Sequence, residues 1–284
     1  MKLVDDFKQY KLLKTSNGKK LEVWNDFVLL RPDPEVIWEQ ELNSKCDAVY
    51  ERSNTGGGKW NIYNNKLNKP WQISYKDYVF NLKLMSFKHT GLFPEQAYNW
   101  NYIEEVIKKS NRKVKVLNLF AYTGGASVAA LHAGAEVVHV DSSKGMIEWA
   151  KENVKSSHLD DRPIRFLQDD CLKFVKREIR RGNKYDIILM DPPSFGRGSS
   201  GEVWNIENSL FELVSLCKEL LSDNPIMLLI NSYTTGLSKT VLENILNILL
   251  VNDLGGHITS DELGIKEENS NIILPCGNFA RWEK

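Results

Sequence analysis

Short apolar runs alternate with longer amphipathic segments along the last two thirds of the chain. Five of the runs are predicted strands: residues 114–119, 136–140, 164–167, 185–190 and 226–230. The segments around them are predicted helices: residues 95–109, 126–132, 143–155, 172–181, 205–221 and 239–249. Strands that alternate with helices form right-handed βαβ units around a mostly parallel sheet. Two further strands, at residues 257–259 and 279–283, would give a Rossmann-like, doubly wound α/β sheet of seven strands.

The first 85 residues have a different pattern, which is typical of β-structure. Residues 21–30 mix apolar and polar side chains and follow the turn Ser16-Asn17-Gly18. Asn-Gly between such runs is typical of a hairpin. Residues 55–58 are predicted to form a loop, and residues 71–84 alternate loosely enough for one or two more strands. We therefore expect a smaller β-rich accessory domain at residues 1–85 and a second domain at residues 86–284.

Composition narrows the class of protein. Lys and Arg number 37, as do Asp and Glu, so the net charge of zero excludes strong steering of the whole molecule toward nucleic acid or an anionic membrane. No apolar run reaches the ~18 residues of a membrane span, and acids stand where a signal peptide has its apolar core. The cysteines lie far apart without a CxxC pair: Cys46, Cys171, Cys217 and Cys276. We expect a cytoplasmic protein with reduced thiols, no membrane contact and no metal.

Residues 51–90 carry a local excess of positive charge, with seven basic and two acidic residues. The same segment holds seven aromatic residues: Trp60, Tyr63, Trp71, Tyr75, Tyr78, Phe80 and Phe87. Cations meet phosphates and rings stack on bases, so this mixture suits a nucleic-acid surface. The alternative is a β-layer whose rings are core and whose lysines are solvated. The first interpretation predicts that four lysines share one accessible face: Lys59, Lys66, Lys69 and Lys76.

Two motifs follow the first two predicted strands of the second domain. Residues 116–125 (VLNLFAYTGG) end a strand and open a helix, where glycine lets the backbone approach a ligand and free N–H groups face it. The motif lacks the GxGxxG spacing of a dinucleotide site. Asp141 closes the next strand, where an acid typically accepts hydrogen bonds from ribose hydroxyls. A tight turn and a helix-capping Asp are the structural alternatives.

Two further motifs follow the third and fourth strands. A carboxylate of Asp169 or Asp170 could accept a hydrogen bond from an adenine amino group, cap the next helix, or do both. Residues 191–195 (DPPSF) combine an acid with two prolines, which fix φ and remove two backbone donors. What remains is a rigid edge of acceptors, Asp191 and nearby carbonyls, beside the ring of Phe195. Such an edge suits a planar nitrogenous base.

These four motifs, in this order, resemble those of class I S-adenosylmethionine-dependent methyltransferases, in which a [D/N]PP[F/Y/W] segment serves enzymes that act on nucleic-acid bases. The resemblance can be narrowed to one family within this class. Residues 88–96 (KHTGLFPEQ), with Asn99-Trp100, resemble the segment that precedes the catalytic domain in the family of the bacterial 23S rRNA cytosine-5 and guanine-N7 methyltransferases. The resemblance covers residues 75–284. The first 75 residues resemble only a branch without the usual N-terminal RNA-binding module.

The resemblance implies S-adenosylmethionine as cofactor and RNA, in particular ribosomal RNA, as partner. It assigns cofactor-binding positions to Gln96, Phe120, Ala121, Tyr122, Thr123, Gly124, Asp141, Ser142, Asp170 and Asp191. It assigns the catalytic loop to Asp191, Pro192, Pro193 and Phe195, with Phe195 as the ring that stacks on the base. Asp170 matches the adenine-side acid better than Asp169. His89 is either a base or, as we favour, a structural histidine.

One departure from the family bears on the chemistry. Its cytosine-5 members attack C6 of the base with a cysteine thiolate from the segment after the fifth strand, and here residues 231–236 read NSYTTG. Methylation of carbon needs that covalent step, whereas a nitrogen lone pair attacks the methyl group directly. We therefore expect a nitrogen acceptor, with Cys276 as a migrated nucleophile the alternative. Cys171 and Cys217 are expected in the core.

The sequence thus predicts a methyltransferase of a base in RNA, with 23S rRNA favoured. One alternative keeps the enzyme and changes the substrate to a protein amide or a small molecule, because DPP-type loops also serve glutamine methylation. Another is a cofactor-binding RNA assembly factor without turnover.

Overall fold

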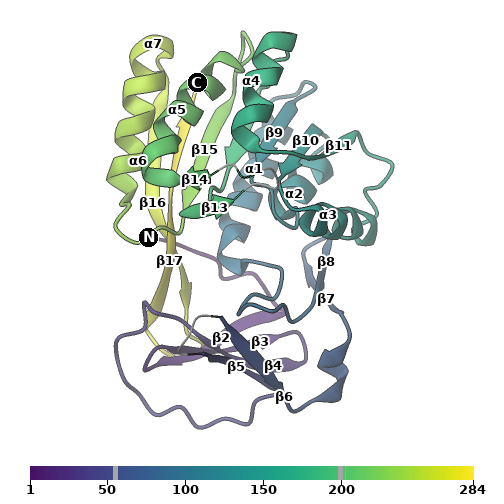
Figure 1. The fold of residues 1–284 in the computed structure, drawn as a ribbon, viewed down its shortest axis with the longest axis vertical. Coiled ribbons are helices and arrows are strands. Elements are labelled where there is room, and N and C mark those ends of the chain that lie inside the picture. Colours follow the sequence, from purple (N-terminus) through teal and green to yellow (C-terminus); the bar gives the residue numbers. More distant parts are fainter. Residues whose placement is uncertain (54–56, 198–200, 202) are drawn as a thin grey trace. The chain divides into compact units, whose positions relative to one another are not determined.

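The computed structural model describes residues 1–53, 57–197, 201 and 203–284. The chain forms two compact units (Figure 1). The first holds Met1, Asn99–Leu263 and Gly277–Lys284, and the second holds Lys2–Tyr98 and Gly264–Cys276. Compact units need not coincide with domains, so the predicted division after residue 85 stays a prediction. Of the predicted loop at residues 55–58, Thr55 and Gly56 lie outside the described residues.

The first unit is built on parallel strands: β9 (Lys115–Leu119), β10 (Glu136–Asp141), β11 (Ile164–Gln168), β12 (Ile187–Met190) and β15 (Met227–Ser232). They pair in the order β15-β12-β9-β10-β11, and each pairing is parallel. The strand β17 (Ile273–Glu283) pairs antiparallel with β15, and β16 (His257–Lys266) follows it. The predicted Rossmann-like α/β sheet is confirmed. The strand order of this sheet also includes β1 (Lys2–Leu3), whose residues belong to the second unit and which is too short to leave a pattern in the sequence.

Helices lie on both faces of this sheet. They are α1 (Ala97–Lys109), α2 (Gly125–His132), α3 (Lys144–Ser156), α4 (Cys171–Arg181), α5 (Ile206–Glu219), α6 (Lys239–Leu246) and the single turn α7 (Asn252–Leu254). A π-helical turn, η3 (Asn247–Val251), joins α6 to α7. Apolar side chains of α4, α5 and α6 form one buried cluster with alternate residues of the strands, such as Leu117 and Leu119 of β9. On the opposite face Ser127 of α2 bonds with Asn118 of β9 and His139 of β10.

The second unit is mostly β-structure, as predicted. A five-stranded sheet runs in the order β2 (Tyr10–Ser16), β3 (Lys19–Trp24), β4 (Phe27–Pro32), β5 (Ala48–Arg52), β6 (Gly58–Ile62). A separate hairpin pairs β7 (Trp71–Tyr75) with β8 (Tyr78–Leu82), and two short 3₁₀ helices are η1 (Asn65–Asn68) and η2 (Pro94–Gln96).

The turns explain how the hairpins of the second unit form. Asn17 and Gly18 both have positive φ, 51° and 74°, which confirms the predicted Asn-Gly turn between β2 and β3. Residues 21–30 belong to two strands, because Asn25 also adopts a left-handed φ of 57° and reverses the chain between β3 and β4. Asparagine tolerates this conformation without glycine beside it, so the second turn, at Asn25 and Asp26, lacks the Asn-Gly signal of the first.

A second unexpected element follows the predicted DPPSF loop. The strands β13 (Phe195–Arg197) and β14 (Val203–Asn205) pair antiparallel and form a hairpin that leads into α5. The loop after β12 is therefore continued by ordered β-structure before the next helix begins.

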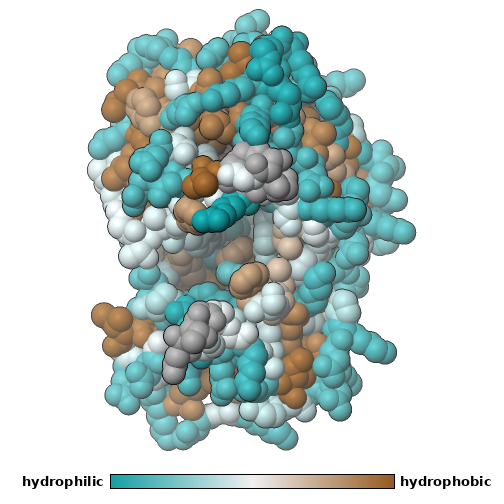
Figure 2. Space-filling model, viewed as in Figure 1, coloured by the Kyte–Doolittle hydropathy of each residue, from teal (hydrophilic) through white to brown (hydrophobic). Residues whose placement is uncertain are grey.

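Two further features, a membrane-spanning helix and a metal-binding cluster, are not found among the described residues. Figure 2 shows a face covered mostly by hydrophilic residues, among which hydrophobic residues form small scattered patches. No helix in the part of the chain that the structure describes is long and apolar enough to cross a membrane. Within those same ranges no group of three or more His, Cys, Asp or Glu residues is placed to hold a metal ion.

Candidate active site

The predicted motifs meet at the carboxyl edge of the main sheet. They are residues 120–124 after β9, Asp141 at the end of β10, residues 169–170 after β11, residues 191–195 after β12 and residues 231–236 at the end of β15. The Asp169 N–H donates to the Asp141 carbonyl at 3.0 Å, and the hydroxyls of Ser194 and Thr234 are 2.7 Å apart. Ligands of parallel α/β sheets bind at this edge.

The loop at residues 120–124 has a strained backbone. Phe120 and Tyr122 adopt left-handed φ values of 52° and 50°, and Gly124 has a φ of 88°. Each such non-glycine residue costs about 1–3 kcal/mol, and strain of this kind gathers at ligand sites. A Cβ on Gly124 would also lie 3.2 Å from the Cβ of Ala150, so the helix α3 leaves little room for any side chain there. Packing against α3 thus accounts for glycine at residue 124, and the backbone approach of a ligand to this loop stays a prediction.

A buried polar network supports this loop from beneath. The Asn118 amide donates to the Ser127 hydroxyl at 3.0 Å, and Ser127 lies 2.9 Å from Nδ1 of His139. Asn153 of α3 donates to the Thr123 carbonyl at 2.8 Å. Burial lowers the pKa of His139 to about 3, so its ring is neutral. These residues were missed, although a histidine within the apolar run of residues 136–140 was a visible signal.

Asp141 ties the loop to its neighbouring strand. Its Oδ2 accepts the Tyr122 N–H at 2.9 Å and its Oδ1 accepts the Ser143 N–H at 2.8 Å. Burial raises the pKa of this carboxyl, and the two N–H groups act against that rise. Each carboxylate oxygen can accept a second hydrogen bond. The geometry therefore fits a ribose with two hydroxyls, and Ser142, exposed beside Asp141, stays a predicted contact.

The two adjacent acids after β11 have different partners. Asp169 pairs with Arg177 of α4, whereas Asp170 caps that helix by accepting the Lys173 N–H at 2.8 Å. The capping interpretation is thus confirmed for Asp170. Its adenine-binding role stays a prediction, and the cap fixes the carboxylate at the edge of the sheet where that role would need it.

The DPPSF loop is held by groups that the sequence did not indicate. Trp204 of β14 donates its indole N–H to the Pro193 carbonyl at 2.6 Å, and Ile206 N–H donates to the Ser194 carbonyl at 3.0 Å. Two carbonyls at the predicted edge of acceptors are therefore already hydrogen-bonded, one by β14 and one by the first residue of α5. Phe195, which begins β13 at the end of this loop, is 55% exposed.

Trp204 also joins this loop to the loop after β9. Its ring lies against the ring of Phe120 with centroids 4.9 Å apart. Since Trp204 is buried and hydrogen-bonded at the same time, it fixes the relative position of the two loops that the sequence assigned to cofactor and base. Trp204 is thus a site residue that sequence reasoning missed.

Gln96 and His89 belong to the second unit. Gln96 is buried as the last residue of η2, and its predicted cofactor contact stays a prediction. Burial, together with the nearby Arg31, Lys88 and Lys20, lowers the pKa of His89 to about 4. A histidine that is neutral and half-buried against Phe93 suits the structural role that we favoured.

The structure of the basic segment, residues 51–90, agrees in part with each of the two interpretations. Lys59, Lys66, Lys69 and Lys76 are all exposed. Of the seven rings, three are buried as the β-layer interpretation expected: Tyr75, Tyr78 and Phe80. Tyr63 and Phe87 remain 67% and 59% exposed, so the basic segment also has exposed aromatic surface.

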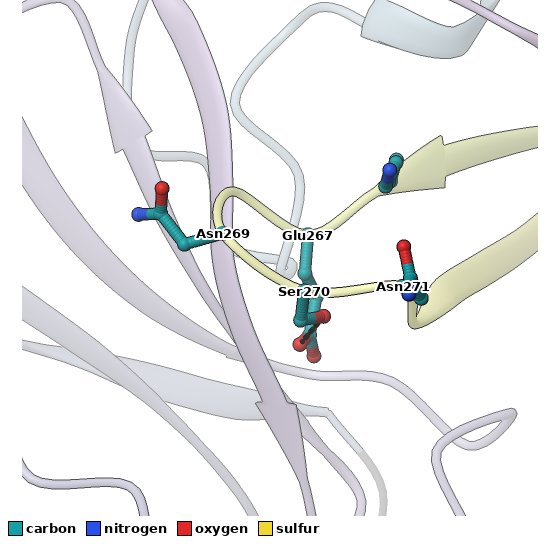
Figure 3. A pocket seen from close by; sticks show the side chains of 5 residues that line it. Glu267, Asn269, Ser270 and Asn271 are labelled. Carbon is teal, nitrogen blue, oxygen red and sulfur yellow. Dashed lines mark hydrogen bonds between the residues drawn. The ribbon is translucent and has the colours of Figure 1, made fainter.

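A hollow in the second unit lies at the turn between β16 and β17 (Figure 3). Its buried carboxylate, Glu267, accepts hydrogen bonds from Thr15, Gln40 and Ser270. These donors satisfy the carboxylate, so Glu267 anchors the turn on β2 and the hollow has no apparent ligand chemistry.

The chain matches the family model described as S-adenosylmethionine-dependent methyltransferase over residues 54–240. A solved S-adenosylmethionine-dependent methyltransferase from Agrobacterium tumefaciens is 36% identical, with a TM-score of 0.94 and coverage of 99% of this chain and 92% of that one. A candidate methyltransferase solved with SAH is 22% identical, with a TM-score of 0.73 and coverage of 98% and 76%, and it shows the same fold.

A curated relative from Pseudoalteromonas atlantica is named ribosomal RNA large subunit methyltransferase K/L. It is 38% identical over 178 residues, which are 62% of this chain and 23% of the relative. This chain spans about a quarter of the length of the curated relatives that it matches.

Proposed function

Because the chain belongs to the S-adenosylmethionine-dependent methyltransferase family, we propose that it methylates a base in RNA, with 23S rRNA as the favoured substrate. The observation that carries the proposal is the loop at residues 191–195, which follows β12 at the carboxyl edge of the sheet and holds both an acid, Asp191, and the exposed ring of Phe195. The large-subunit rRNA methyltransferase named among the relatives supports the same substrate.

The residues at this edge divide into those that hold the cofactor and those that position the base. The backbone of residues 120–124, the Asp141 carboxylate and the Asp170 carboxylate would hold the methionine, ribose and adenine parts. The bound cofactor supplies an electrophilic methyl group on a sulfonium. Phe195 would stack on the target base, and Asp191 would orient an N–H of that base and accept its proton as the nitrogen–carbon bond forms.

The positions of the cysteines support a nitrogen acceptor. Cys171 and Cys217 are buried on α4 and α5, and burial raises the pKa of both thiols. Burial, together with the carboxylates of Glu95, Asp33 and Glu22, raises the pKa of the Cys276 thiol well above its usual value, although Lys20 acts in the opposite direction. A thiol of raised pKa is a poor nucleophile. The segment after β15 carries Tyr233 and Thr234 in place of a cysteine.

Radiolabelled transfer tests this proposal directly. The purified protein, given tritiated S-adenosylmethionine, should label total RNA from a strain that lacks it and leave total protein unlabelled. Nucleoside mass spectrometry of the labelled rRNA should then show a base methylated on nitrogen. Label in a protein amide or a small molecule would overturn the RNA substrate, a 5-methylpyrimidine would overturn the nitrogen acceptor, and no label anywhere would favour an assembly factor.

A further inference from the structure

One corner of the five-stranded sheet in the second unit is crossed by the chain just before the KHTGLFPEQ motif. The Trp60 indole donates to the carbonyls of Met85 and Phe87 at 2.9 and 3.2 Å, and the Tyr50 hydroxyl donates to the Ser86 carbonyl at 3.3 Å. Tyr50 and Trp60 are directly opposed on β5 and β6, so they point to the same face of the sheet. Residues 85–87 therefore lie along this face.

The strand register places cations on that same face. Lys20 opposes Arg31 across β3 and β4, and Arg52 lies two residues beyond Tyr50 on β5. Side chains two residues apart in a strand share a face. Arg31 also lies two residues beyond Leu29, which pairs with β5 on the Tyr50 face. The Arg31 guanidinium donates to the Lys88 carbonyl at 3.0 Å, so Lys88 joins this corner.

Two of the four cations are neutralised within the fold. Arg31 makes a bidentate pair with the buried Glu22, at 2.6 and 2.8 Å, and Lys20 lies 3.1 Å from Asp33. By contrast, no carboxylate in the described ranges is within ion-pair distance of Arg52 or Lys88, and the Lys88 ammonium donates to the Pro32 carbonyl at 3.2 Å.

The electrostatics of Lys88 agree with this convergence of cations. Burial lowers the pKa of its ammonium to about 8, and Lys20, Arg31 and Arg52 lower it as well, while Asp33 acts in the opposite direction. His89 beside it is neutral at pH 7. An added anion would relieve this repulsion.

We propose that Arg52, Lys88 and the exposed ring of Phe87 form a contact surface for single-stranded RNA, with the cations on a phosphate and the ring stacked on a base. The inference rests on the proposed function, because RNA must be the substrate for this surface to have a use. Phe87 is 59% exposed although its backbone is fixed by Trp60, so the ring is presented on a rigid support. Base stacking on such rings tolerates any sequence.

The test measures binding of a short fluorescein-labelled single-stranded RNA by anisotropy at several salt concentrations. The double variant Arg52→Ala/Lys88→Ala should weaken binding on the order of 10-fold and lower the slope of log affinity against log salt by about 0.7 for each phosphate that is no longer neutralised. The matched control is Lys155→Ala/Arg180→Ala, two exposed cations of the first unit, which should stay within about twofold of the parent. Calorimetric binding of S-adenosylmethionine should be unchanged in both.

Two single variants separate the parts of the surface. Phe87→Leu should weaken RNA binding and Phe87→Trp should retain it, because only an aromatic ring stacks. Parent affinity should fall as pH rises through about 8, where Lys88 loses its proton, and Lys88→Arg should bind as well at pH 7 and lose that pH dependence.

If the parent binds and methylates RNA while Arg52→Ala/Lys88→Ala keeps both its affinity and its salt slope, this surface is wrong and the proposed function stands. If the parent methylates no RNA, the proposed function itself fails.

Discussion

Replacing Asp141 with alanine tests whether this carboxylate holds the ribose. The change removes the acceptor of two backbone N–H groups, those of Tyr122 and Ser143, together with the predicted acceptor of the ribose hydroxyls. A hydrogen bond to a charged group contributes about 1.5–3 kcal/mol. Water can replace the carboxylate at the two N–H groups, since Asp141 is only partly buried, but it cannot hold the ribose.

We therefore expect Asp141→Ala to weaken S-adenosylmethionine binding by about 1.5–3 kcal/mol, which is on the order of 10- to 150-fold. Isothermal titration calorimetry on the purified variant measures this. Asp160→Ala is the matched control, because Asp160 is an exposed acid that lies away from the carboxyl edge of the sheet. Asp160→Ala should bind like the parent.

A double-mutant cycle with the ligand separates damage to the loop from removal of the ribose hydrogen bonds. An S-adenosylhomocysteine analogue without the ribose hydroxyls should bind more weakly to the parent than the complete ligand does. It should lose little further affinity in Asp141→Ala, because those hydrogen bonds are already absent. A folded Asp141→Ala variant that binds the complete ligand as the parent does would refute the ribose role, and equal further loss would assign the whole effect to the loop.

The other predictions concern catalysis, RNA contact and stability. Asp191→Ala should lower kcat by on the order of 10²-fold with S-adenosylmethionine affinity nearly unchanged, and equal kcat would remove Asp191 from proton transfer. Changing all four cysteines to serine should leave methyl transfer within a few-fold if the variant folds, whereas a folded, RNA-binding but inactive variant, or a covalent adduct with 5-fluorocytosine RNA, would indicate carbon-5 chemistry. Replacing four exposed lysines with glutamate should lower the affinity for rRNA fragments and flatten its salt dependence; these are Lys59, Lys66, Lys69 and Lys76. Unchanged binding would mean that these lysines are solvated and do not contact RNA. Burial opposes the charge of Glu22, yet Arg31 and Lys20 hold its pKa at about 2. The free energy of unfolding should therefore fall as pH drops from about 4.5 toward 2, and Glu22→Gln should remove this part of the acid dependence in urea titrations.

The parallel sheet could be predicted because its local signals agree with its tertiary context. The run at residues 226–230 is apolar throughout and the run at residues 114–119 is mostly apolar, as is typical of strands buried on both faces. Asp170 and Ser143 stand where the helices after them need caps. The second half of β16 and the first half of β17 were not predicted. Their polar residues, such as Asp261, Glu262 and Asn278, form strands only through pairing with partners distant in sequence.

The motifs of the candidate site could be predicted from the sequence, whereas the residues that hold those motifs in place could not. Asp141 and Asp191 stand at strand ends, which a sequence shows directly. The role of Trp204 could not be recognised from the sequence, because its hydrogen bond to the Pro193 carbonyl depends on a hairpin whose strands have three residues each. Such short strands have no detectable period, and pairing alone sets their register.

The same limit applies to the cations of the second unit that surround Lys88. The count of charges in residues 51–90 indicated a cationic surface and drew attention to four lysines, Lys59, Lys66, Lys69 and Lys76. It could not distinguish an exposed lysine from Lys88, whose pKa is lowered by burial and by Lys20, Arg31 and Arg52, which come from three different strands. Only the register of β3, β4 and β5 brings Lys20, Arg31 and Arg52 to one face. A count of charges therefore points to the segment, whereas the pairing of distant strands decides which of its cations could meet one phosphate on the surface that we propose.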